Sequence, residues 1–169
     1  FKHFGMAETT ARKDTCFAMI GSNHKLSNLQ AAVGVVQMEH IDELLERRKE
    51  LANHYIDILG DVDGVELPTT TPNGEHSWQS FCVFVEHRDE VMKILRSEGI
   101  EVQIGTYALH LHPAYQESKY CRINGDLVGS LRAYRDCLAL PLYHQLEKDQ
   151  QRRVVSRLAE VVQEIKNRG

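Results

Sequence analysis

Apolar residues recur with a helical period between Ser27 and Gly60. A helix start is expected at Ser27, because Gln30 follows it at the spacing of a capping box, and Gly60 is of the residue type that commonly follows a helix end. The apolar positions are Leu26, Leu29, Val33, Val36, Ile41, Leu44, Leu45, Leu51, Ala52, Tyr55, Ile58 and Leu59. Because the pattern is long and changes phase, it predicts a kink or break near Gly34 or His40.

The second half of the chain alternates between strand-like and helix-like patterns. A strand is expected within residues 76–86, where both alternating faces are apolar, after a turn-rich segment that includes a short edge strand. The remaining expected elements are a helix at 89–96, a strand at 100–104 that completes a β-α-β unit, and helices at 127–137 and 148–166. With only one helical crossover, the predicted fold class is α+β: a long helix and a small sheet of three or four strands covered by helices.

Composition and charge exclude several classes of protein. The chain has 169 residues, a formal net charge of −4 and scattered cations, so nucleic acid is not an expected partner. Four cysteines without a CxxC pair indicate reduced thiols. No apolar run approaches the roughly 20 residues of a membrane helix, and no signal peptide is evident, so we expect no membrane partner and a cytoplasmic protein. The chain begins with Phe1, which suggests a piece of a longer protein.

Two segments carry candidate chemistry. Residues 21–25, Gly-Ser-Asn-His-Lys, place amide, hydroxyl, imidazole and ammonium donors directly before the helix start. Such donors beside a helix N-terminus suit an anion such as phosphate, although a simple polar turn explains the same pattern.

The second segment is TYALHLHPAY, in which His110 and His112 follow Tyr107. The two histidines are compatible with an ordinary half-buried pair, with a ligand-binding or acid–base role, or with a metal site. A metal would need further ligands, for which Cys121 and His144 are the nearest candidates in the sequence.

The segment GSNHKLSNLQAAVGVVQM resembles the G-x-N-x-R-[ML]-S-x-[LI]-Q-A-A-x-G-x-x-Q-[LM] segment of the DegT family of sugar aminotransferases, pyridoxal-phosphate enzymes of fold type I. HSWQSFCVFV, EGIEVQIGTYALHLHPAY and LALPLYHQLEKDQQRRVV are similar to later landmarks of that family, in the same order. The resemblance implies the C-terminal part of such an enzyme. Residues 1–26 would then end the large cofactor domain, 27–60 form a connecting helix, and 61–169 form the small domain.

The resemblance also implies roles for individual residues. Asn23 matches the asparagine that reaches across a dimer interface to the cofactor phosphate, and Lys25 stands where the family usually has arginine. Tyr107 and His110 match positions near the substrate sugar and its phosphates. The family's Schiff-base lysine lies upstream of the G-x-N motif, so no catalytic residue is expected here and the 169 residues alone should be inactive.

The implied activity is transfer of an amino group from glutamate or glutamine to a nucleotide-linked keto-sugar, with pyridoxal 5'-phosphate as cofactor. Sugars of this kind occur in cell envelopes and antibiotics, and a homodimer is expected. One alternative is a non-catalytic dimerisation or regulatory module derived from the small domain. A second alternative is a small metal protein built on His110, His112 and Cys121.

Overall fold

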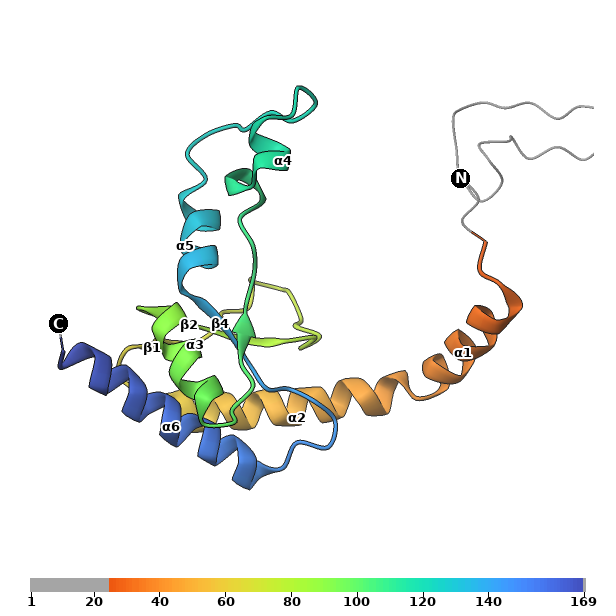
Figure 1. Ribbon diagram of the computed structural model, residues 1–169. Coiled ribbons are helices and arrows are strands. Elements are labelled where there is room, and N and C mark those ends of the chain that lie inside the picture. Colours follow the sequence, from red (N-terminus) through yellow and green to blue (C-terminus); the bar gives the residue numbers. More distant parts are fainter. Residues whose placement is uncertain (1–24, 169) are drawn as a thin grey trace, which may run out of the picture. The chain divides into compact units, whose positions relative to one another are not determined.

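The computed structural model describes residues 25–168 of the chain (Figure 1). Its elements are α1 (Asn28–Glu39), α2 (Ile41–Leu59), β1 (Val65–Glu66), β2 (Phe81–Val85), α3 (Arg88–Ser97), β3 (Gln103–Ile104), the 3-10 helix η2 (Leu109–Leu111), α4 (Pro113–Gln116), α5 (Val128–Asp136), β4 (Cys137–Leu140) and α6 (Lys148–Lys166). Contacts within the chain divide it between Asp42 and Glu43 into two units. The predicted division at residues 26 and 60 stays a prediction.

The expected long helix is two helices that meet at His40. Ser27 starts α1 with a complete capping box, in which its hydroxyl accepts from the Gln30 amide at 3.3 Å and its own amide donates to the Gln30 side chain at 3.0 Å. His40 ends α1 in a non-helical conformation, with its amide on the Gln37 carbonyl at 3.2 Å. The break therefore falls at one of the two predicted positions.

The sheet has four strands in the order β1-β2-β4-β3, and every neighbouring pair is antiparallel. Strand β4 lies between β2 and β3, so the predicted β-α-β unit is a split one whose two strands do not pair with each other. The predicted α+β class with a small sheet is confirmed.

Two predicted strands are shorter than expected, and long-range contacts explain why. Residues 76–80 do not join β2, because Trp78 has a left-handed backbone (φ 51°) and Arg48 donates to the carbonyls of Trp78 and Gln79 at 2.9 and 2.8 Å. Ile100 does not start β3, because its amide closes the end of α3 on the Leu95 carbonyl at 3.0 Å, after Gly99 at φ 78°.

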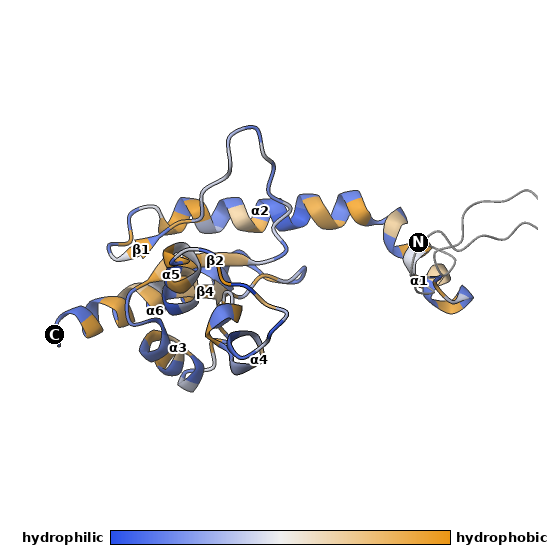
Figure 2. Ribbon diagram, turned by 90° about the horizontal axis from the view of Figure 1, so that it is seen from above, coloured by the Kyte–Doolittle hydropathy of each residue, from blue (hydrophilic) through white to orange (hydrophobic). Residues whose placement is uncertain are grey.

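The hydrophobic core lies on one face of the sheet, under α2, α3 and α6 (Figures 1 and 2). Phe81 stacks on Tyr55 of α2 at 4.9 Å between ring centroids. The core side chains of the sheet and helices include Phe81, Val83, Val85, Leu138, Leu140, Leu51, Tyr55, Leu59, Val91, Leu95, Val154, Val155, Leu158, Val161 and Val162. Helix α5 contacts the opposite face, where the Arg132 guanidinium lies 4.8 Å from the Phe84 ring centroid.

Two further features of the described residues relate to the sequence expectations. No helix within residues 25–168 is both long enough and apolar enough to cross a bilayer. Cys82, Cys121 and Cys137 carry free thiols.

Candidate functional site

The loop after β3 carries the candidate residues Tyr107, His110 and His112. It leaves the sheet at Gly105, whose amide donates to the Cys137 carbonyl of β4 at 3.0 Å. A side chain at Gly105 would collide with the Cys137 sulfur, so only glycine allows this approach. The loop then forms η2 and α4, which the irregular sequence pattern did not predict.

His112 joins these two short helices. Its amide closes η2 on the Leu109 carbonyl at 3.0 Å, and it precedes Pro113 at the first position of α4, where a missing amide hydrogen costs nothing. The backbone around both histidines is thus fixed by local hydrogen bonds and by proline.

Three rings meet beside this loop, and we call them the aromatic trio: Tyr107, His112 and Tyr134. Their centroids lie 6.3 Å apart for Tyr107 and His112, 6.2 Å for Tyr107 and Tyr134, and 6.5 Å for His112 and Tyr134. Tyr107 is 59% exposed, while the other two are half-buried. The trio therefore presents an aromatic surface with two hydroxyls and an imidazole.

The structure places the other predicted site residues separately. His110 is half-buried on η2 and has no ring contact with the trio among residues 25–168. Lys25 is exposed just before the start of α1, in the unit that precedes Glu43. Asn23 lies outside the described residues. The binding roles of Asn23, Lys25, Tyr107 and His110 remain predictions.

The metal alternative gains no support from the fold. Within the described part of the chain, no three His, Cys, Asp or Glu side chains come together as a group that could hold a metal ion. His110, His112 and Cys121 are therefore not gathered into a site.

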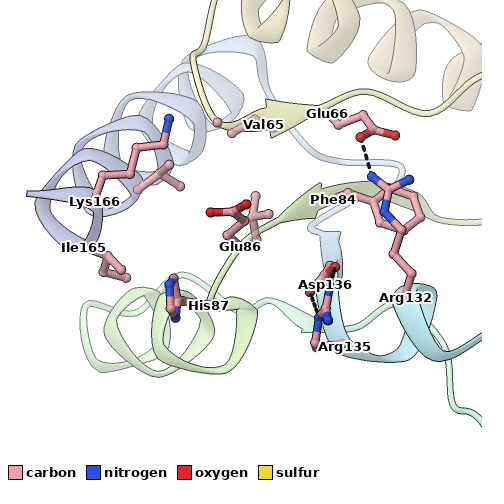
Figure 3. Close-up of a pocket in the computed structure, with 13 residues that line it drawn as sticks. Val65, Glu66, Phe84, Glu86, His87, Arg132, Arg135, Asp136, Ile165 and Lys166 are labelled. Carbon is pink, nitrogen blue, oxygen red and sulfur yellow. Dashed lines mark hydrogen bonds and ion pairs between the residues drawn. The ribbon is translucent and has the colours of Figure 1, made fainter. Parts of the chain in front are cut away.

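An open cleft of about 640 Å³ lies between β1, β2, α5 and α6 (Figure 3). Three cations line it, and each is paired: Arg132 with Glu66, Arg135 with Asp136 at 2.7 Å, and Lys166 with Asp63 at 2.8 Å. The hydrogen bonds from Arg135 hold the pKa of Asp136 below its ordinary value. The cleft is thus internally neutralised, which does not favour it as a phosphate site.

Comparison with known proteins identifies the family. The model of the DegT/DnrJ/EryC1/StrS aminotransferase family matches residues 1–159. The chain belongs to this family.

Relatives of known name are longer than this chain. It is 33% identical over 141 residues to a dTDP-3-amino-3,4,6-trideoxy-alpha-D-glucose transaminase of Streptomyces venezuelae, which covers 83% of this chain and 37% of the relative. It is 33% identical over 139 residues to the erythromycin biosynthesis protein EryC1 of Saccharopolyspora erythraea, covering 82% and 37%. The chain thus spans under two fifths of the length of these relatives.

Solved structures of the family share the fold. The chain superposes on S. venezuelae DesV, solved in complex with a ketimine intermediate, with a TM-score of 0.76 and 32% identity, covering 89% of this chain and 40% of DesV. A DegT/DnrJ/EryC1/StrS aminotransferase from Brucella abortus gives a TM-score of 0.77 at 27% identity, covering 95% and 41%.

Enzymes of this family use pyridoxal phosphate, so we asked whether the described residues fit that cofactor. A cofactor aldehyde needs a lysine amine in a protected site, and all six lysines within residues 25–168 are exposed. The cleft lysine, Lys166, is already bonded to Asp63. The described residues alone therefore do not form a cofactor site.

Tyr134 was not predicted from the sequence as a site residue. It lies on α5, 22 residues beyond His112, and neither its spacing nor its neighbours mark it. Only the packing of α5 beside the loop brings it to Tyr107 and His112.

Proposed function

We propose that residues 1–169 form the C-terminal part of a pyridoxal-phosphate-dependent aminotransferase that moves an amino group from glutamate or glutamine to a nucleotide-linked keto-sugar. The main support is the similarity to the S. venezuelae transaminase, whose name states a dTDP-linked amino sugar. The similarity in fold to DesV supports the same proposal.

Helix α1 gives independent support that more polypeptide surrounds this chain. None of its residues is buried, and its only charged residue is Glu39. Leu29, Val33 and Val36 lie on one side, whereas Val35 and Met38 lie on the opposite side, and all are at least half exposed. A helix that is apolar on opposite sides belongs inside a larger protein core, and its 12 residues are short of the roughly 20 that span a bilayer.

In this proposal the chain supplies binding groups. Asn23 donates its side-chain amide to the cofactor phosphate of a neighbouring subunit in a homodimer, and Lys25 provides a cation for the anionic substrate. Tyr107 and His110 offer a hydroxyl and an imidazole to the sugar and its phosphates. The reactive lysine and the acidic partner of the cofactor ring belong to polypeptide outside the 169 residues.

The test uses the chain joined to the polypeptide that precedes Phe1 in its gene. The joined protein should bind pyridoxal phosphate, seen as visible absorbance, and should aminate a dTDP-linked keto-sugar with glutamate or glutamine as donor. The 169 residues alone should do neither. Cofactor binding without amination of any nucleotide-linked sugar would contradict the proposed substrate class.

Two variants test the binding roles. His110→Ala should raise KM for the nucleotide sugar roughly tenfold with little change in KM for the amino donor. His144→Ala, which removes an exposed histidine outside the loop, is the control and should leave both unchanged. Asn23→Ala should weaken cofactor binding, and an unchanged cofactor affinity would remove Asn23 from the site.

A further inference from the structure

Arg88, the first residue of α3, is a buried arginine whose three side-chain nitrogens each donate to a named partner. Its side chain is 2% exposed. Nη2 donates to the Tyr134 carbonyl at 2.6 Å, Nη1 to the Cys137 carbonyl at 2.9 Å, and Nε to the Asp89 carboxylate at 2.7 Å. Burying a charge is costly unless it is paired, and these three hydrogen bonds offset that cost for the Arg88 guanidinium.

The two carbonyls belong to the place where α5 ends and β4 begins. Carbonyls in the last turn of a helix have no partner within the helix, and the negative end of the helix dipole lies there. A planar guanidinium can bond both carbonyls at once, which the ammonium of lysine cannot do with the same geometry. Arg88 therefore fixes the end of α5 to the start of α3.

Tyr134, whose carbonyl Arg88 holds, is also the inner member of the aromatic trio. Its ring centroid lies 6.0 Å from the Arg88 guanidinium. The other side of the trio is formed by Tyr107 and His112, at 6.2 and 6.5 Å from Tyr134. A displacement of Tyr134 would remove the ring against which both of these side chains rest.

We propose that Arg88 is a positioning residue for binding of the nucleotide-linked sugar. It holds Tyr134, and through Tyr134 it sets the orientation of Tyr107, a proposed substrate contact, and of His112 beside it. Arg88 itself is buried and does not touch the substrate. The substrate side of this inference rests on the proposed function, whereas the link from Arg88 to the trio is a property of the chain alone.

The first experiment measures the link in the 169-residue chain by NMR. Cross-peaks between the rings of Tyr107 and Tyr134, and of His112 and Tyr134, should be present in the native chain and lost in Arg88→Met. The matched control is Arg48→Met, because Arg48 also donates to two carbonyls, those of Trp78 and Gln79, away from the trio. Arg48→Met should keep both cross-peaks. Retention of the cross-peaks in a folded Arg88→Met chain would overturn the inference.

The second experiment measures kinetics in the joined protein described above. Arg88→Met and Tyr134→Leu should each raise KM for the nucleotide sugar roughly tenfold, with kcat and KM for the amino donor changed about twofold or less. Arg88→Lys should give an intermediate KM, since it restores the charge without the fork. Tyr134→Leu keeps the backbone carbonyl that Arg88 binds, so an unchanged KM in this variant rules out a role of the Tyr134 ring, and with it the inference, whether or not Arg88→Met folds.

The outcomes separate the two proposals. An equal rise in KM for Arg48→Met, or an unchanged KM in Tyr134→Leu, would overturn the positioning role. A joined protein that aminates no nucleotide sugar would defeat the proposed function, while the NMR comparison would still decide whether Arg88 orders the trio.

Discussion

Helices α1 and α6 begin in the same way but differ completely in what they bury. In both, the glutamine at the third helical position reaches back to the amide of the residue before the helix: Gln30 to Ser27 at 3.0 Å and Gln150 to Glu147 at 2.9 Å. Helix α6 then buries seven side chains, and α1 buries none. The start of a helix is thus encoded locally, whereas its burial depends on partners elsewhere.

The arrangement of apolar residues accounts for the difference. In α6 they form one stripe, including Val154, Leu158 and Val161, with charged residues on the other side (Figure 2). One stripe needs one partner surface, and the sheet with α2 and α3 supplies it. In α1 the apolar residues occupy opposite sides, so a single neighbouring layer could not cover them. The comparison supports the proposal that α1 belongs to the core of a larger protein.

The largest expected difference between the two helices is the stability effect of replacing a leucine by alanine in each. Leu158→Ala in α6 should lower the free energy of unfolding of the 169-residue chain by about 2–5 kcal/mol, because Leu158 is fully buried. Leu29→Ala in α1 should change it by about 0.5 kcal/mol or less, since Leu29 is 78% exposed. Urea unfolding followed by circular dichroism measures both.

The same two substitutions in the joined protein test whether α1 is buried there. There Leu29→Ala should also become costly, because the added polypeptide covers α1. A Leu29→Ala cost that stays near zero in the folded joined protein would contradict the burial of α1.

Much of the fold follows from the sequence. Period predicts α6, capping predicts the start of α1, and the apolar residues within 76–86 predict a strand there, of which Phe81–Val85 form β2. The strand ends could not be predicted, because they depend on contacts such as that of Arg48 with Trp78, 30 positions away. The position of β4 between β2 and β3 likewise depends on contacts between residues far apart in the sequence, which no local pattern encodes.

The candidate site was less accessible to sequence reasoning. The roles of Tyr107 and His110 came from the family resemblance, and the residue types of His110 and His112 alone left three interpretations open. No sequence pattern indicates that Tyr134 and Arg88 act together, because the hydrogen bond that links them joins residues 46 positions apart. A buried arginine is also unexpected from composition, since charged residues are almost never fully buried unless they are paired.

A smaller effect is expected from Gly34→Ala in α1. Gly34 lies in mid-helix with no atom near the added methyl group, and alanine is more favourable than glycine there by about 1 kcal/mol. Because α1 buries nothing, the helical signal of the 169-residue chain should rise while its urea midpoint stays the same. The control is Gly129→Ala in α5, also uncrowded, which should raise the free energy of unfolding by about 0.4–1 kcal/mol. A midpoint shift in Gly34→Ala as large as that in Gly129→Ala would show that α1 is coupled to the core.

The smallest effect concerns the charged side of α6, and it depends on pH. Arg157 donates to Glu98 at 2.6 and 2.7 Å, and these hydrogen bonds hold the pKa of Glu98 below its ordinary value of 4.5. A lowered carboxyl pKa stabilises the folded state above the unfolded value, and this stabilisation is lost as the pH falls through the folded value. Arg157→Met should therefore be less stable than the native chain near neutral pH, and the two urea midpoints should converge as the pH falls from the ordinary value of 4.5 through the lower folded value.

Arg152→Met is the matched control for this last comparison, since Arg152 bonds only to Asp149 within α6, at 2.6 Å among the described contacts. Both members of this pair are exposed, so the midpoint of Arg152→Met should follow that of the native chain at every pH. A gap between Arg157→Met and the native chain that does not narrow at acidic pH would mean that Arg157 acts by packing its long side chain and not through its ion pairs with Glu98, Glu160 and Glu164. In that case the ion pairs of Arg157 would add nothing to the packing of the apolar stripe, and the contrast with α1 would rest on burial.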